Sequence, residues 1–279
     1  MNHVLILGMG YTGQALAAAL DRKRWRVTGT TREGGDGTIA WPGTDMRPHL
    51  ARATHLLISI APDGDGDPVL NALEQDIAEV APGLKWAGYL STTGVYGDHG
   101  GGWVDEDTPL TPATTRGEQR VAAEARWQAL AASTGLPLHI FRLAGIYGPG
   151  RGPFAKVRRG TARRIIKPGQ VFSRIHVADI VQVLTASMAR PDPGRIYNVC
   201  DDEAAPPEDV LAHAAELLGL PVPPAEDYAT AEMTAMARSF YAESKRVRND
   251  RIKRELGVTL RYPTYREGLR ALLRAERSA

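Results

Sequence analysis

The sequence predicts an α/β protein built on a doubly wound parallel sheet, and three observations lead to this fold class. Short apolar runs alternate with segments of helical period along the chain. The first apolar run, residues 4–7, leads directly into a glycine-rich turn and then into an alanine-rich segment. No apolar run approaches the roughly 18 residues of a membrane-spanning helix. We therefore expect parallel strands joined by crossover helices, and no membrane partner.

Residue type and spacing define the expected elements. We expect strands at residues 4–7, 25–30, 38–41, 55–60, 86–91, 138–143 and 197–199. We expect helices from the glycine-rich turn to about residue 20, around 70–80, and at 117–133, 177–184 and 207–218. The second half is less regular than the first. We therefore expect residues 1–150 to form the core, and residues 151–279 to complete it and to form a small C-terminal substrate lobe.

The composition limits the classes of function. With 34 Lys and Arg against 32 Asp and Glu, the net charge of +2 lacks the strong basic field of a nucleic-acid-binding protein. Cys200 is the only cysteine, which excludes an intrachain disulfide. The N-terminus lacks the layout of a secretory signal. We expect a cytoplasmic protein that binds a small molecule, and we expect no metal site.

The glycine-rich turn carries the clearest functional signal. It matches G-x-G-x-x-G between a strand and a helix, where the first glycine permits a tight turn and the second lets the backbone approach a pyrophosphate. The third glycine lets the helix pack closely on the strand, and the helix N-terminus favours negative charge. The turn predicts a Rossmann-type fold that binds NAD(P) through Gly8, Gly10, Tyr11, Thr12 and Gly13.

The end of the second strand bears on the choice between NAD and NADP. An NAD site usually carries Asp or Glu roughly 20 residues after the glycines, where the carboxylate holds the ribose 2′-hydroxyl. Here the strand ends Thr30-Thr31-Arg32, with no carboxylate before Glu33. Arg32 can pair with a 2′-phosphate, and Thr30 or Thr31 can hydrogen-bond it. The sequence therefore favours NADP, with NAD as the alternative. The alternative interpretation is that Arg32 is a surface arginine with no role in binding.

Five later segments extend the pattern. In chain order they are Leu-Ser-Thr-Thr-Gly-Val-Tyr-Gly at 90–97, Val-Asp-Glu-Asp-Thr-Pro at 104–109, Arg-Leu-Ala-Gly-Ile-Tyr-Gly-Pro-Gly at 142–150, Arg-Ile-His-Val-Ala-Asp at 174–179 and Tyr-Asn-Val at 197–199. With the glycine turn, they make the chain resemble the extended short-chain dehydrogenase/reductases, the NAD-dependent epimerase/dehydratase group. The resemblance implies an oxidoreductase or epimerase, a nucleotide-linked substrate and a homodimer.

The residues that carry chemistry in that family are only partly present. By position, Thr92 matches the Ser or Thr that steadies the substrate oxygen. Arg116 and Arg120 stand where the family has its catalytic tyrosine and, four residues on, its lysine. An arginine stays protonated, so it does not readily exchange a proton. Arg120 can still hold ribose hydroxyls or a phosphate. Arg116 can bind an anionic substrate or form a salt bridge on its helix.

The substrate is expected beyond the sixth strand, because ligands of open α/β sheets bind at the carboxyl ends of the strands. We expect Tyr96, Tyr147 and Arg151 to contact it, and the basic residues that follow suit an anionic substrate. Two functions stay open. One is an NADP-dependent oxidoreductase or sugar-nucleotide epimerase/dehydratase with atypical acid/base groups. The other is an NADP-binding sensor or scaffold with little or no turnover.

Overall fold

A single seven-stranded sheet organises the protein, in a computed structural model that describes residues 1–278. The strand order is β11-β7-β5-β4-β1-β2-β3, and every neighbouring pair is parallel. The strands are β1 (Asn2–Leu7), β2 (Trp25–Thr31), β3 (Thr38–Ala40), β4 (His55–Ile58), β5 (Trp86–Thr92), β7 (Leu138–Leu143) and β11 (Ile196–Val199). The order reverses between β1 and β4, as in a doubly wound sheet, so the predicted fold class is confirmed.

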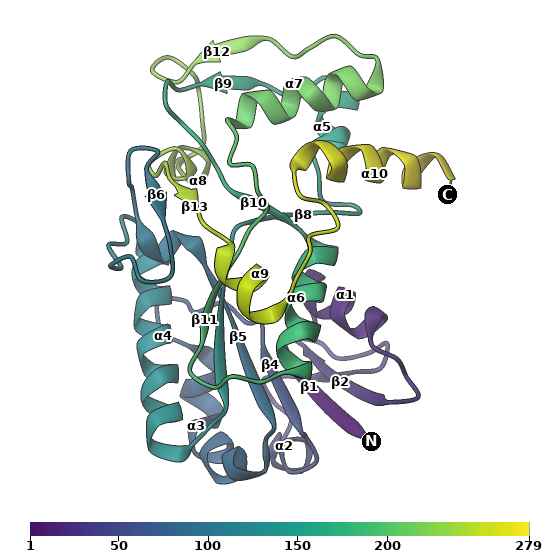
Figure 1. Ribbon diagram of the computed structural model, residues 1–279, viewed down its shortest axis with the longest axis vertical. Helices are drawn as coiled ribbons and strands as arrows, with labels where there is room; N and C mark the ends of the chain where they lie inside the picture. Colours follow the sequence, from purple (N-terminus) through teal and green to yellow (C-terminus); the bar gives the residue numbers. More distant parts are fainter. Residues whose placement is uncertain (279) are drawn as a thin grey trace.

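Helices cover both faces of the sheet (Figure 1). Alternate residues of β1 pack against the helix layers on the two faces of the sheet, because successive side chains of a strand point to opposite faces. Val4 and Ile6 belong to the buried cluster that includes α1 (Tyr11–Ala19) and α6 (Val177–Ala189). Leu5 and Leu7 belong to the cluster that includes α3 (Pro68–Val80) and α4 (Thr115–Thr134). The core is therefore a three-layer sandwich with both sheet faces buried.

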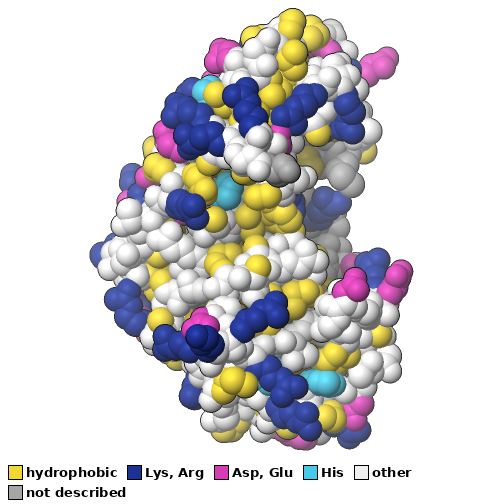
Figure 2. Space-filling view, turned by 90° about the vertical axis from the view of Figure 1, so that its right-hand side faces the viewer, with side chains coloured by type: hydrophobic (Ala, Val, Ile, Leu, Met, Phe, Trp, Pro, Cys, Tyr) yellow, Lys and Arg dark blue, Asp and Glu magenta, His cyan; other side chains and the backbone are white. Residues whose placement is uncertain are grey.

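Three small two-stranded sheets join segments that are distant in the chain. They pair β6 (Trp103–Val104) with β13 (Arg246–Val247), β8 (Gly145–Tyr147) with β10 (Arg174–His176), and β9 (Arg164–Ile166) with β12 (Ala225–Asp227). A separate buried cluster forms the upper lobe, mainly from α5 (Phe154–Arg158), α7 (Pro207–Leu218) and α10 (Tyr265–Ser278). Figure 2 shows Lys and Arg side chains gathered on one face of this lobe. The remaining elements are α2 (Arg47–Leu50), η1 (Ala81–Gly83), η2 (Thr93–Tyr96), α8 (Ala235–Phe240) and α9 (Asp250–Leu256).

The connection between β2 and β3 contains no helix. A turn at residues 32–37 links the two parallel strands directly, so no crossover helix lies between β2 and β3. A groove of about 690 Å³ remains beside α1, lined among others by Met9, Gln14, Thr31 and Thr38. The groove therefore begins next to the glycine turn and runs along β2. Among the described residues, no helix is long and apolar enough to cross a membrane.

Candidate functional site

The glycine turn is anchored to the neighbouring strand β2. The amide of Gly8 donates to Thr30 Oγ1 at 3.0 Å, and the amide of Met9 donates to the Thr30 carbonyl at 2.7 Å. Gly8 has a φ of +95°, and a Cβ atom there would lie 2.8 Å from Cγ1 of Ile60. Both the conformation and the space therefore require glycine at this position.

The other two glycines of the motif differ in their surroundings. A Cβ built on Gly13 would lie 3.1 Å from both the Gly8 carbonyl oxygen and Cγ2 of Ile6, so helix and strand are in close contact there. A Cβ built on Gly10 meets nothing within 4 Å. Gly10 is exposed, and its φ of −84° and ψ of −162° suit any residue. The space in front of Gly10 is therefore open to a ligand.

The first turn of α1 presents unpaired amides to that space. Gly10 is the N-cap and supplies no side-chain hydrogen bond, whereas the amide of Gln14 is already bonded to the Gly10 carbonyl. Within residues 1–278, the amides of Tyr11, Thr12 and Gly13 have no acceptor. Free amides at a helix N-terminus, where the dipole adds partial positive charge, form an anion site. The geometry fits the pyrophosphate of a dinucleotide.

An exposed cation directly follows the end of β2, the strand that holds the glycine turn. Thr31 Oγ1 accepts from the amide of Gly34 and shares a hydrogen bond with Thr38 Oγ1, both at 3.0 Å, so its hydroxyl shapes the turn into β3. Arg32 is exposed and forms no ion pair with any described residue. The next residue, Glu33, is also exposed. The strand therefore ends in an unpaired guanidinium.

The residues at the family's catalytic positions lie in different surroundings. Thr92 is half-buried and caps η2, its Oγ1 accepting from the Gly94 amide at 3.2 Å. Arg116 is exposed on the first turn of α4, and its side chain makes no hydrogen bond or ion pair in the part of the chain that the structure describes. Arg120 is half-buried, and its Nη1 donates to the Leu90 carbonyl at 2.6 Å and to the Tyr89 hydroxyl at 3.2 Å. One end of the Arg120 guanidinium is therefore occupied by strand β5.

Tyr96 lies inside the core. Its side chain is fully buried, and its hydroxyl donates to Asn198 Oδ1 at 2.7 Å while accepting from Arg142 Nη1 at 2.9 Å. Arg142 in turn forms a buried ion pair with Glu124 at 2.7 Å. Burial raises the pKa of Tyr96 to about 12. The hydroxyl has no free direction for a ligand, so Tyr96 is not part of the site that we propose.

Tyr147 ends the strand β8 and Arg151 follows it, but the two side chains face different parts of the protein. Tyr147 is buried, and its ring fills the space above Gly268, where a Cβ would lie 2.1 Å from the tyrosine oxygen. Burial raises the pKa of Tyr147 well above its ordinary value of 10.0. Arg151 is exposed, and its guanidinium carbon lies 5.6 Å from the centre of the Tyr11 ring. Sequence reasoning did not foresee this contact, which joins residues 140 positions apart.

A tyrosine and a lysine with the family's spacing do occur elsewhere, at Tyr241 and Lys245. The catalytic spacing places both side chains on one face of a helix. Here α8 ends at Phe240, and the following residues form a turn and the short strand β13. Lys245 Nζ donates to the Gly97 carbonyl at 2.7 Å and pairs with Glu243 at 2.6 Å. Lys245 therefore connects the C-terminal segment to the loop after η2, and Tyr241 and Lys245 do not share a helix face.

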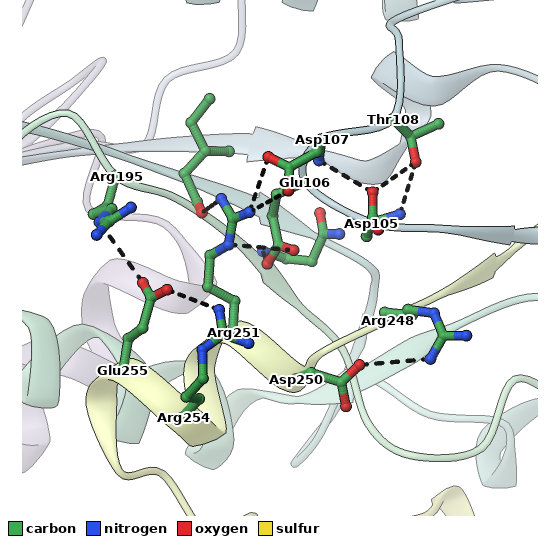
Figure 3. Close-up of polar contacts among 12 residues, drawn as sticks. Asp105, Glu106, Asp107, Thr108, Arg195, Arg248, Asp250, Arg251, Arg254 and Glu255 are labelled. Atoms are coloured by element: carbon green, nitrogen blue, oxygen red, sulfur yellow. Dashed lines mark hydrogen bonds and ion pairs between the residues drawn. The ribbon is translucent and has the colours of Figure 1, made fainter.

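Glu106, an acidic residue of the 104–109 segment, lies in an ion-pair cluster beside α9 (Figure 3). Its Oε1 accepts from the Asn198 amide at 2.8 Å, and its Oε2 lies 3.7 Å from Arg251 Nε. Arg251 also pairs with Asp107 at 2.9 Å. Burial raises the pKa of Glu106. The cluster fixes β11 and α9 to the loop after β6, which is a structural task.

Comparisons with known proteins give the family context. A family model described as "NAD dependent epimerase/dehydratase family" matches residues 71–200. Protein YeeZ of Escherichia coli (strain K12) is 30% identical over 286 residues, which cover 94% of this chain and 97% of YeeZ. A solved structure of a functionally unknown conserved protein from Silicibacter pomeroyi DSS is 60% identical, with a TM-score of 0.94 and 99% of each chain covered. The structure of MoeE5 in complex with UDP-glucose and NAD is 21% identical, with a TM-score of 0.80 and 99% of each chain covered, and shows a likeness of fold.

Proposed function

The chain belongs to the NAD-dependent epimerase/dehydratase family, and from this premise we propose that it binds NADP and transfers a hydride to or from an anionic, nucleotide-linked substrate. The proposal rests on the N-terminus of α1. Three unpaired amides, at Tyr11, Thr12 and Gly13, face the open space at Gly10. When bound there, the cofactor supplies the hydride chemistry. The chain's own residues hold the pyrophosphate and orient the nucleotide across the carboxyl ends of the strands.

The preference for NADP rests on Arg32. An unpaired guanidinium suits a 2′-phosphate, and β2 does not end in a carboxylate that would hold a ribose diol instead. The test is Arg32→Gln, with Arg26→Gln as a matched control, because Arg26 is an exposed arginine on the same strand. We expect NADPH affinity to fall about tenfold in R32Q, as for loss of one charged contact of about 1.4 kcal/mol. NADH affinity should stay within about twofold in both variants.

An anionic, nucleotide-linked substrate is supported by the charge of the lobe. Lys156 and Arg159 are exposed on and just after α5, in the chain segment that follows β8, whereas Arg158 between them pairs with Glu276 at 2.5 Å. Positive charge around a binding cleft raises the local concentration of an anion. The likeness of fold to MoeE5, whose complex contains UDP-glucose, agrees with such a substrate. A cytoplasmic location and a homodimer remain our predictions.

A second function, NADP binding without turnover, is favoured by one observation. Hydride transfer to a carbonyl also requires a proton, which the family's tyrosine supplies. Here that position is the exposed Arg116, and Arg120 is already bonded to strand β5. The buried Tyr96 and Tyr147 hold their protons far above neutral pH, since burial raises the pKa of both. Neither tyrosine replaces the missing acid.

Kinetic experiments separate the two functions. NADPH consumption is measured with a panel of carbonyl compounds and nucleotide sugars, alongside binding of NADPH by calorimetry. Turnover with any substrate supports the enzyme, whereas binding with no turnover across the panel supports the sensor. The double variant Arg116→Tyr and Arg120→Lys restores the family pair. Hydride transfer gained by this variant alone would show that the pocket is otherwise competent and that the natural chain lacks the proton donor.

A further inference from the structure

Tyr11 connects the first turn of α1 to the loop that follows β8. Its hydroxyl donates to the Pro149 carbonyl at 3.0 Å. A Cβ on Gly148 would lie 2.4 Å from the Tyr11 oxygen and 2.7 Å from Cγ1 of Val177, so only glycine lets the loop approach this closely. The loop at residues 148–151 therefore rests directly on the residue that begins the phosphate-binding helix.

The same loop holds Arg151 in a fixed place. Gly148 and Arg151 exchange two backbone hydrogen bonds of 2.9 Å, which close a four-residue turn through Pro149 and Gly150. The turn places the Arg151 guanidinium 5.6 Å from the centre of the Tyr11 ring. Arg151 is exposed, and it has no carboxylate partner among residues 1–278. A cation thus stands unpaired beside the end of α1 that carries the free amides.

We propose that Arg151 binds the pyrophosphate of the dinucleotide together with the α1 amides. This inference rests on the proposed function. A helix N-terminus contributes only about half a positive charge, whereas a pyrophosphate bridge carries about two negative charges. A guanidinium adds a full charge and paired donors that match phosphate oxygens. The sequence placed Arg151 with the substrate, and its position over Tyr11 assigns it to the cofactor.

The test compares ligands that contain the pyrophosphate with one that lacks it. Arg151→Gln, Arg151→Lys and the control Arg52→Gln are titrated with NADPH, ADP-ribose and adenosine 2′-monophosphate by calorimetry. Arg52 is a matched control because it is also exposed and forms no ion pair in the described chain, and because it precedes β4, at the amino ends of the strands rather than the carboxyl ends. We expect R151Q to bind NADPH and ADP-ribose about 10- to 30-fold more weakly, as for one lost charged hydrogen-bonding contact. Adenosine 2′-monophosphate should bind within about twofold of wild type, because it has no pyrophosphate.

Two further results complete the test. R151K, which keeps the charge but not the paired donors, should lie between wild type and R151Q, and the difference between wild type and R151Q should shrink at high salt. All variants should melt at the wild-type temperature. Equal binding of all ligands by R151Q and wild type would overturn the role of Arg151 while leaving the proposed function intact. An equal loss for adenosine 2′-monophosphate would also overturn it. A wild-type protein that binds neither NADPH nor ADP-ribose would overturn both.

Discussion

Gly10→Val separates cofactor binding from folding, because the added side chain points into open space. A Cβ at this position meets no atom within 4 Å, and the backbone angles are allowed for valine. The cost to stability is the replacement of a glycine N-cap by valine, at most about 1 kcal/mol. For a protein of this size we expect the melting temperature to fall by no more than about 4 °C.

The effect on binding is much larger. The valine side chain occupies the space in which the pyrophosphate meets the amides of Tyr11, Thr12 and Gly13. Loss of two hydrogen bonds to a charged group costs about 3–6 kcal/mol, at about 1.5–3 kcal/mol each. NADPH affinity should therefore fall at least about 100-fold, which corresponds to about 2.7 kcal/mol. Calorimetry with NADPH measures the affinity, and thermal melting followed by circular dichroism measures the stability.

Gly13→Val is the matched comparison. Its Cβ would press against the Gly8 carbonyl and the Ile6 side chain at 3.1 Å, so we expect a loss of about 1–3 kcal/mol in the free energy of unfolding. The two variants should thus differ: G10V melts within about 4 °C of wild type and loses the ligand, whereas G13V loses more stability than G10V. Wild-type NADPH affinity in G10V would refute our placement of the cofactor.

Two other predictions concern stability. Glu124→Ala leaves Arg142 buried without its ion-pair partner, since both side chains are at most 4% exposed, and should lower the free energy of unfolding in urea by about 3–5 kcal/mol. Glu74→Ala breaks the exposed pair with Arg126 and should lower it by less than about 1 kcal/mol. Similar losses for both variants would contradict the reasoning. Burial raises the pKa of Asp201 from 3.8 to about 8, so the folded protein holds this proton more tightly than the unfolded chain and loses stability as the pH rises from about 4 to about 8. Asp201→Asn removes that loss, which is about 6 kcal/mol at most. The variant should melt at a higher temperature than wild type at about pH 9 but not below about pH 4, and melting temperatures that are equal at every pH would count against the reasoning.

The order of strands and helices in the core could be predicted from the sequence because it depends on local patterns. The apolar run at residues 4–7 is buried on both faces, and the glycine motif between it and the next helix fixes a tight turn. Most predicted strands lie within two residues of the observed ones. The structure also has no helix between β2 and β3, where six residues separate the strands and where no helix is expected from the sequence. Local spacing was sufficient for all these elements.

The short strands and the surroundings of the site residues could not be predicted in this way. The pair of β6 and β13 consists of two residues on each side, from positions more than 140 residues apart, so neither segment shows a strand pattern of its own. Likewise, the position of Arg120 against Leu90 depends on how α4 packs on β5. The contact of Arg151 with Tyr11 requires the complete fold. The sequence shows the chemical type of each candidate site residue, but it does not show which other residues its side chain contacts.

The place of β11 at the edge of the sheet has a consequence for synthesis of the chain. Strand β7 ends at Leu143, but its outer neighbour β11 is not complete until Val199. A nascent chain that has emerged from the ribosome up to residue 150 therefore has β7 as an unpaired edge strand, whose backbone groups can pair with another chain. Until the rest of the polypeptide emerges, the unfinished sheet is exposed to aggregation, so this interval of translation is where a chaperone would protect it most.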